Sequence, residues 1–174
     1  AMTPLRVEQL RHIDHIQNSS GILQQLISDI LDVTKIESGQ LALEAAAFDP
    51  GELVQSAVAS CAPAGEQKGL VIYSCVDTSV PACVHGDAAR IRQILSNLLG
   101  NAIKFTNAGH VITRLRAESL PDEKVRLSLQ VVDSGPGIGP EERKRLFEPF
   151  YRINGGSHTV GGMGIGLALS ARLA

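Results

Sequence analysis

The sequence has no large excess of charge of either sign, which argues against the partners that a charged surface selects. Its 174 residues include 16 lysine and arginine residues and 18 aspartate and glutamate residues, for a formal net charge of −2 at pH 7. Domains that bind nucleic acid generally carry a basic face, because they neutralise backbone phosphates. We therefore expect no nucleic-acid partner.

Long apolar runs are also missing. No uninterrupted apolar segment approaches the roughly 18 residues that cross a bilayer, and the N-terminus lacks a basic segment followed by the apolar core of a signal peptide. The apolar content of 44% is nevertheless that of an ordinary domain with a buried core. We expect this part of the chain to lie outside the membrane, in the cytoplasm.

Cysteine is scarce as well. Cys61, Cys75 and Cys83 form no CxxC pair, and their odd number argues against a closed disulfide framework. We expect reduced thiols, as in the cytosol, and no metal site built on sulfur.

A long helix is predicted at the N-terminus. From Val7 to Leu43 there is no proline, and apolar residues recur at helical spacing up to Gly39, a plausible C-terminal stop. At 1.5 Å per residue, residues 7–38 would reach roughly 45 Å, which is longer than a compact domain needs. We expect this helix to project and to present its apolar stripe to a partner; the alternative is that it packs on its own domain.

Helical and strand patterns follow one another in the rest of the chain. We predict a helix over 49–64 with Asp49 as its cap, a strand over 70–76, a helix over 87–105, a hairpin of strands 110–117 and 124–133, a short helix after Gly139 and a helix from Ile165. The chain is therefore a mixed α/β protein.

Two asparagines lie on one face of the helix predicted at 87–105. Asn97 and Asn101 are four residues apart, with Gln93 one turn before and Lys104 one turn after. Such amides are costly in an apolar helix unless something bonds them. An amide oxygen is a suitable ligand for Mg²⁺ held mainly by substrate phosphates. The alternative is that both amides bond to the local backbone.

Two glycine-rich segments follow. Asp133, at the end of a predicted strand, begins the segment DSGPGIG, where a carboxylate can accept from an exocyclic amine and residues without Cβ let a flat ring approach. The glycines of 161–167 lead into a helix, whose free N–H groups favour phosphate. Their spacing fits neither a dinucleotide-binding fingerprint nor a P-loop.

Taken in order, these segments carry a family resemblance. The sequences QILSNLLGNAIKFT (93–106), DSGPGI (133–138), LFEPFYR (146–152) and GGMGIGLALS (161–170) resemble the N, G1, F and G2 boxes of the sensor histidine kinases of two-component signalling. ISDILDVTKIESGQL (27–41) is similar to the end of the second dimerisation helix, especially in hybrid kinases.

The resemblance implies a fold and an activity. Residues 1–44 would be the second helix of the dimerisation domain, and residues 45–174 a catalytic ATP-binding domain, a two-layer α/β sandwich of the Bergerat type. The family normally adds about two strands after such a C-terminal helix, and we expect them to be missing here. The parent would be a kinase that uses ATP and Mg²⁺, self-associates through the long helix, serves a response regulator or receiver domain, and is anchored in the inner or plasma membrane.

The resemblance also assigns residues. It implies catalytic roles for Asn97 and Lys104, Mg²⁺ ligation by Asn101, and lid anchoring by Phe147 and Phe150. The residues implied to bind ATP are Asn97, Asn101, Lys104, Asp133, Gly135, Gly137, Ile138, Phe150, Arg152, Gly162, Met163, Gly164, Ile165, Gly166 and Leu167. Met163 stands where the family most often has threonine.

The phosphoacceptor motif is absent. The family accepts phosphate on a histidine followed by an acid and, a few residues later, Thr-Pro, and neither His12 nor His15 has that context. We expect ATP binding without autophosphorylation, and a weakened or non-native dimer. The alternatives are a degenerate nucleotide-binding module that acts through its helix on a partner kinase, and a serine-directed anti-sigma kinase, a group that lacks the long helix.

Overall fold

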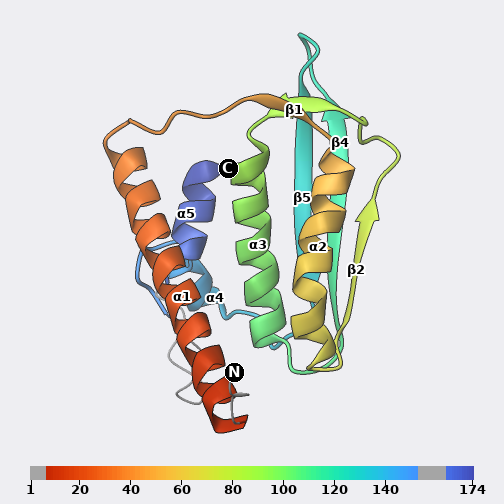
Figure 1. Ribbon diagram of the computed structural model, residues 1–174. Coiled ribbons are helices and arrows are strands. Elements are labelled where there is room, and N and C mark those ends of the chain that lie inside the picture. The colour runs from red at the N-terminus through yellow and green to blue at the C-terminus, as the bar shows by residue number, and fades with distance from the viewer. Residues whose placement is uncertain (1–6, 153–163) are drawn as a thin grey trace, which may run out of the picture. The chain divides into compact units, whose positions relative to one another are not determined.

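The computed structural model describes residues 7–152 and 164–174 (Figure 1). The chain divides into two compact units, Ala1–Leu41 and Ala42–Ala174. The helices are α1 (Val7–Glu37), α2 (Pro50–Glu66), α3 (Ala88–Phe105), α4 (Pro140–Arg145) and α5 (Gly166–Leu173), and the strands are β1 (Ala46–Phe48), β2 (Val71–Val76), β3 (Val84–Gly86), β4 (His110–Ser119) and β5 (Val125–Asp133).

The first unit is the long helix α1, as the apolar spacing predicts. Its 31 residues end at Glu37, and the backbone N–H groups of Gly39 and Gln40 donate to the carbonyls of Ile36 and Lys35 at 3.1 and 2.8 Å. Of the α1 side chains that the structure describes, six large apolar ones are exposed: Ile13, Ile16, Leu23, Ile27, Ile30 and Leu31. Among the helices of the described residues, none has the length and apolar character that a bilayer crossing requires.

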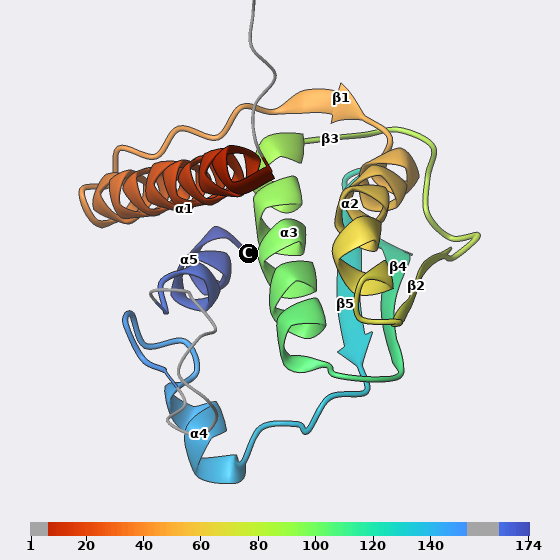
Figure 2. The ribbon, with the colours of Figure 1, turned by 60° about the horizontal axis from the view of Figure 1, so that its bottom comes forward.

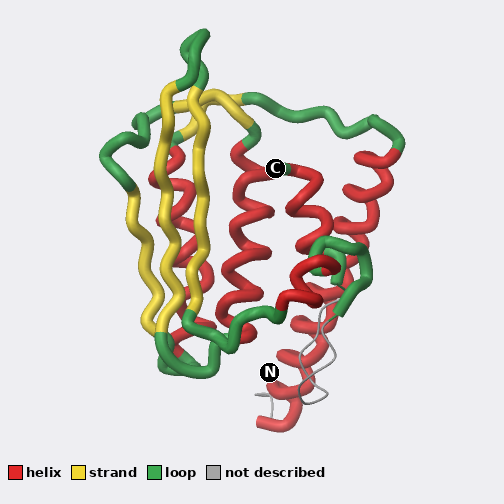
Figure 3. Tube along the Cα trace, turned by 180° about the vertical axis from the view of Figure 1, so that it is seen from behind, coloured by secondary structure: helices red, strands yellow, loops and turns green. Residues whose placement is uncertain are grey.

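The second unit is a two-layer α/β arrangement. Strands β2, β4 and β5 form one sheet in the order β2-β4-β5, with β2 parallel and β5 antiparallel to β4, while β1 and β3 form a separate antiparallel pair. Helices α2 and α3 cover one face of the larger sheet (Figure 2). Within the described ranges no helix covers the opposite face, which Figure 3 shows from behind.

The core lies between this sheet and its two helices. Val111 and Leu115 of β4 point inward while Arg114 points outward, because successive side chains of a strand alternate between its faces. Leu95 and Leu99 of α3 are fully buried against them, and each side chain contributes about 2 kcal/mol by leaving water. This packing fixes α3 on the sheet.

Aspartates begin both core helices. Asp49 Oδ1 accepts from the backbone N–H groups of Gly51 and Glu52 at 2.7 and 3.0 Å, so the predicted cap of α2 is confirmed. Asp87 caps α3: its Oδ1 accepts from Arg90 N at 3.0 Å and its Oδ2 from Glu44 N at 3.1 Å. The bonds from Gly51, Glu52 and Arg90 pair N–H groups that the first helical turns leave without a partner, and the bond from Glu44 ties the segment before β1 to the start of α3.

Most predicted elements are confirmed, including the hairpin, which is β4 and β5. Two strands were not predicted: β1 and β3 have three residues each, too few for a period to show. Helix α2 also continues past the expected end at residue 64 to Glu66. Its Pro63 lies in the last turn of the helix.

Candidate functional site

The end of α3 and the turn after β5 lie close together. Figure 2 shows the loop after β5 running past the end of α3 toward α4. Asp133 closes β5, and its Oδ1 accepts from the backbone N–H of Gly135 at 2.9 Å. A Cβ on Gly135 would lie 2.7 Å from that oxygen and 3.3 Å from both the Phe105 carbonyl and Thr106 Oγ1. Only glycine allows the turn to lie this close to the end of α3.

The register of the sheet decides where the Asp133 carboxylate points. Asp133 pairs with Val111, and Val131 pairs with Thr113, so the four side chains share one face of the sheet. Val111 and Thr113 are fully buried on the face that the helices cover. The exposed carboxylate therefore lies at the rim of the helical layer. Its Oδ2 makes no hydrogen bond to the described residues.

A buried hydroxyl borders the same turn. Thr106 is 0% exposed, and its Oγ1 has no hydrogen-bond partner among the described residues. A buried polar atom without a partner is costly, and binding sites are one place where it occurs. Thr113, in the core of the sheet, has the other such hydroxyl. Sequence reasoning included Thr106 in a motif but assigned it no role.

Ser134 holds this turn in place. Its Oγ accepts from the backbone N–H of His110 at 2.9 Å and donates to the Ala108 carbonyl at 3.2 Å. The loop after α3 and the turn after β5 are thereby joined. The Asp133 carboxylate therefore lies in a turn that the hydrogen bonds of Ser134 hold in place.

Two cations lie together on the phosphate side predicted for this site. Burial, and secondly the charge of Arg152, lower the pKa of Lys104 from its ordinary value of 10.5. The Lys104 Nζ also lies 4.7 Å from the centroid of the Phe105 ring. Like charges held together at a partly desolvated place favour the binding of a polyanion.

The two asparagines differ in their surroundings. Asn97 Nδ2 donates to Ser170 Oγ of α5 at 2.9 Å, and a Cβ on Gly166 would overlap the Asn97 amide. Asn97 therefore joins α3 to α5. Asn101 is half-buried, and its side-chain amide makes no hydrogen bond within the part of the chain that the structure describes.

Asn101 is the more suitable residue to hold a cation. Among the described residues there is no group of three or more histidine, cysteine, aspartate and glutamate side chains that could hold a metal ion. An amide oxygen together with ligand phosphates is the kind of donor set that Mg²⁺ accepts. The residues present fit Mg²⁺ that arrives with a nucleotide, and not a metal ion held by protein carboxylates.

The ends of the predicted lid are joined at its base. The backbone N–H of Phe150 donates to the Gly164 carbonyl at 3.0 Å, and a Cβ on Gly164 would lie 2.6 Å from the Tyr151 carbonyl. Phe147 and Phe150 are exposed. This contact brings the F segment beside the start of α5.

The remaining predicted residues have mixed positions. Ile165 is buried, Ile138 and Leu167 are half-buried, and Gly137 has a positive φ of 74°. Gly162 and Met163 lie outside the described residues.

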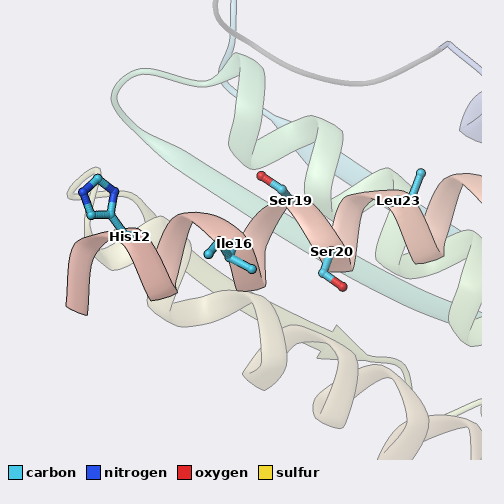
Figure 4. Close-up of a pocket in the computed structure, with 5 residues that line it drawn as sticks. All are labelled: His12, Ile16, Ser19, Ser20 and Leu23. Carbon is cyan, nitrogen blue, oxygen red and sulfur yellow. The ribbon is translucent and has the colours of Figure 1, made fainter. Parts of the chain in front are cut away.

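A separate hollow runs along α1 and is not part of this site. Figure 4 shows its lining, which is His12, Ile16, Ser19, Ser20 and Leu23. These side chains include no carboxylate that could activate the imidazole and no cation that could hold phosphate. The side chain of His15 is not among those described.

Comparisons with known proteins find sensor kinases of similar sequence. The sensor histidine kinase RcsC of Escherichia coli strain K12 is 40% identical over 164 residues, which are 94% of this chain and 17% of RcsC. The sensor protein GacS of Pseudomonas syringae pv. syringae is 37% identical over 170 residues, which are 97% of this chain and 19% of GacS.

A solved structure is similar over nearly the whole chain. The crystal structure of full-length ShkA in complex with AMPPNP has a TM-score of 0.74 and 34% identity, and the match covers 98% of this chain and 34% of that one.

The chain spans less than a fifth of the length of these two curated relatives. Its residues 86–174, half of the chain, match the family described as histidine kinase-, DNA gyrase B-, and HSP90-like ATPase. The resemblance predicted from the four motifs is confirmed, as is the fold class. The chain belongs to this family of ATPases.

Proposed function

We propose that this chain is the ATP-binding catalytic region of a sensor histidine kinase, which transfers the γ-phosphoryl group of ATP to a histidine in two-component signalling. The observation that carries the proposal is the meeting of an acceptor and a cation pair at one end of α3. Asp133 in its turn supplies the acceptor, and Lys104 with Arg152 supplies the two positive charges. The exocyclic amine of adenine requires a hydrogen-bond acceptor, and a triphosphate requires positive charge, so ATP needs both groups in one site.

Asp133 is the proposed base-reading residue. Its Oδ1 is held by Gly135 N, so its Oδ2 remains to accept from the exocyclic amine of adenine. The absence of a side chain on Gly135 leaves the turn low enough for a flat ring to approach. Thr106 Oγ1 is a further polar group beside this turn.

Lys104, Arg152 and Asn101 are the proposed phosphate side. Phosphoryl transfer depends mainly on positioning and on neutralising the negative charge of the phosphates. Mg²⁺, when bound, would neutralise part of that negative charge. Asn101 offers an amide oxygen, and the two cations offer N–H donors. Asn97 is proposed to act indirectly: it does not contact the nucleotide but holds α5 and the turn before it against α3.

Self-association and the parent protein's setting are part of the proposal. The exposed apolar side chains of α1 support a dimer formed through this helix, because so many are rarely left in water. The phosphoacceptor histidine, the receiver domain that takes the phosphoryl group and a membrane anchor would belong to the parent protein.

Calorimetric titration of ATP with and without Mg²⁺ tests the proposal on the wild type and on Asp133→Ala. We expect Mg²⁺-assisted binding that is weakened at least tenfold in the variant, since a charged acceptor is lost. Asp122→Ala, at the far end of the hairpin, is the control and should bind normally. A folded wild type that does not bind ATP would overturn the proposal.

A further inference from the structure

Lys68 lies outside every motif considered above, yet it contacts the end of α3. It follows α2 and precedes β2, and its Nζ donates to the carbonyls of Ile103 at 2.7 Å, Lys104 at 2.9 Å and Thr106 at 3.4 Å. One ammonium group thus bonds three backbone carbonyls between residues 103 and 106, in the segment that carries both sides of the proposed site.

Two of these acceptors, the carbonyls of Ile103 and Lys104, are ones that α3 cannot pair by itself. The last four carbonyls of an α-helix have no N–H partner within the helix. In α3, the Ala102 carbonyl accepts from Thr106 N at 3.0 Å, and the next two carbonyls accept from Lys68. A positive charge at a helix C-terminus is also favourable to the helix dipole.

The ammonium group is held in place from its own side. Lys68 N donates to the Gly65 carbonyl at 2.9 Å, and Leu70 N donates to the same carbonyl at 3.0 Å, which forms a tight turn between α2 and β2. Directly after it, Val71 N donates to the Gly109 carbonyl at 3.0 Å. The turn is therefore fixed to the loop that follows α3. Lys68 links this turn to the end of α3.

We propose that Lys68 is a positioning residue for nucleotide binding, which holds the last turn of α3 so that Lys104 and Asn101 face the phosphates. The inference rests on the proposed function, because it assigns the phosphates to that turn. Lys68 itself does not touch the nucleotide in this account. Its loss should therefore weaken the phosphate contacts more than the contacts of the base, which depend on the turn held by Ser134.

The test compares Lys68→Met with Lys68→Arg, and with Lys124→Met as the matched control, because Lys124 is an exposed lysine in the turn between β4 and β5. Calorimetry with Mg²⁺–AMPPNP and with adenosine separates the phosphate side from the base side. We expect Lys68→Met to weaken AMPPNP about fivefold to tenfold, as the loss of a charged hydrogen bond does. In Lys68→Met the affinity for adenosine should fall less than twofold. Lys68→Arg should keep most of the wild-type affinity for AMPPNP, and Lys124→Met should bind both ligands as the wild type does.

Amide hydrogen exchange without ligand gives an independent measurement. Lys68→Met should speed exchange at residues 104–107, which include the Thr106 N–H bonded to Ala102, and leave the amides of β4 unchanged. If Lys68→Met does not fold, Lys68→Gln replaces it, since it keeps a donor and loses the charge.

Each outcome decides the inference. Unchanged AMPPNP affinity in Lys68→Met, or an equal loss for AMPPNP and adenosine, would overturn it, because the lysine would then be dispensable or would act only on stability. A wild type that binds neither ligand would overturn the proposed function itself. The exchange measurement would then still report whether Lys68 holds the end of α3, so the two failures are distinguishable.

Discussion

At the scale of single residues, the site depends on places where a side chain is missing as much as on places where one is present. Gly166 has no Cβ at the point where the Asn97 amide lies, and the amide can therefore reach Ser170 on the next turn of α5. The glycine spacing indicates a phosphate site but does not show that one of these glycines accommodates an asparagine.

Gly166→Ala should therefore destabilise the chain by about 1–3 kcal/mol, the usual cost of forcing atoms into a packed place. Urea denaturation measures the free energy of unfolding. Gly100→Ala is the matched control, because a Cβ on Gly100 of α3 meets nothing within 4 Å and should gain about 0.5–1 kcal/mol of helix stability. Equal effects of the two substitutions would contradict the close contact of Asn97 with Gly166.

Lys104 predicts a proton uptake on nucleotide binding. Burial and Arg152 lower its pKa below 10.5 in the free chain, and a bound polyanion raises that pKa again. At a pH just below 10.5 the complex should therefore take up protons, and nucleotide affinity should fall as the pH rises through this range. Titrations in two buffers with different ionisation enthalpies measure the uptake. Lys104→Arg should abolish it, because arginine stays charged; an uptake that persists in this variant would assign it to another group.

At the scale of elements, the sequence predicted the long helices and strands, and it did not predict the strands of three residues. The 31 residues of α1 and the alternating strands β4 and β5 repeat their patterns often enough to be recognised. Strands β1 and β3 have three residues each, and their pairing depends on residues 38 positions apart in the chain, as for Ala47 and His85. Sequence periodicity carries no signal for such a pair.

The candidate site divides in the same way. Asp133, Asn101 and Lys104 lie in motifs with a recognisable spacing. Lys68 and Ser170 contact the site through bonds that span 35 and 73 residues. A lysine in a turn and a serine in a helix are ordinary residues until the packing of α2, α3 and α5 brings them to their partners.

Asp87 predicts how the start of α3 responds to acid. The Arg90 N–H first, and the Glu44 N–H, lower the pKa of Asp87 below its ordinary value of 3.8. A carboxylate with a lowered pKa stabilises the fold above the unfolded-state pKa, and this contribution is lost as the pH falls through the folded-state pKa. The loss therefore occurs below about pH 4.

Asp87→Ala should cost about 1 kcal/mol near neutral pH, as the loss of a helix cap does. Asp87→Asn keeps the cap without the charge, so it should retain most of the stability at neutral pH and lose less than the wild type on acidification. Thermal unfolding between pH 3 and pH 7 measures both effects. A steeper acid loss in Asp87→Asn than in the wild type would contradict this account.

At the scale of the whole molecule, α1 and the second unit have different surfaces. The second unit has a buried core, and its exposed large apolar side chains are spread over strands, loops and a helix end, while six of the side chains described in α1 are exposed along one helix. Exposed apolar stripes of this kind mark interaction surfaces. The proposal of a dimer through α1 follows from this contrast.

Replacing two of these side chains should reduce self-association. Ile16→Glu with Leu23→Glu places two charges on side chains that are 67% and 59% exposed, so the fold should tolerate them. We expect the weight-average mass in sedimentation equilibrium to fall toward that of a monomer of 18.5 kDa. Gln17→Glu is the control, because it adds charge at an exposed polar position of α1. A wild type that stays monomeric at high concentration would contradict the dimer.

We infer that the end of α3, the turn after β5 and the start of α5 form one nucleotide site. Backbone chemical shifts of the ¹⁵N-labelled chain, recorded with and without Mg²⁺–AMPPNP, show which residues respond to the nucleotide. We expect the largest changes at residues 101–107, 133–138 and 164–167, and little change on the exposed face of β4 or in the hollow along α1. Changes concentrated on that sheet face or on α1, with none at Asp133 and Lys104, would contradict it.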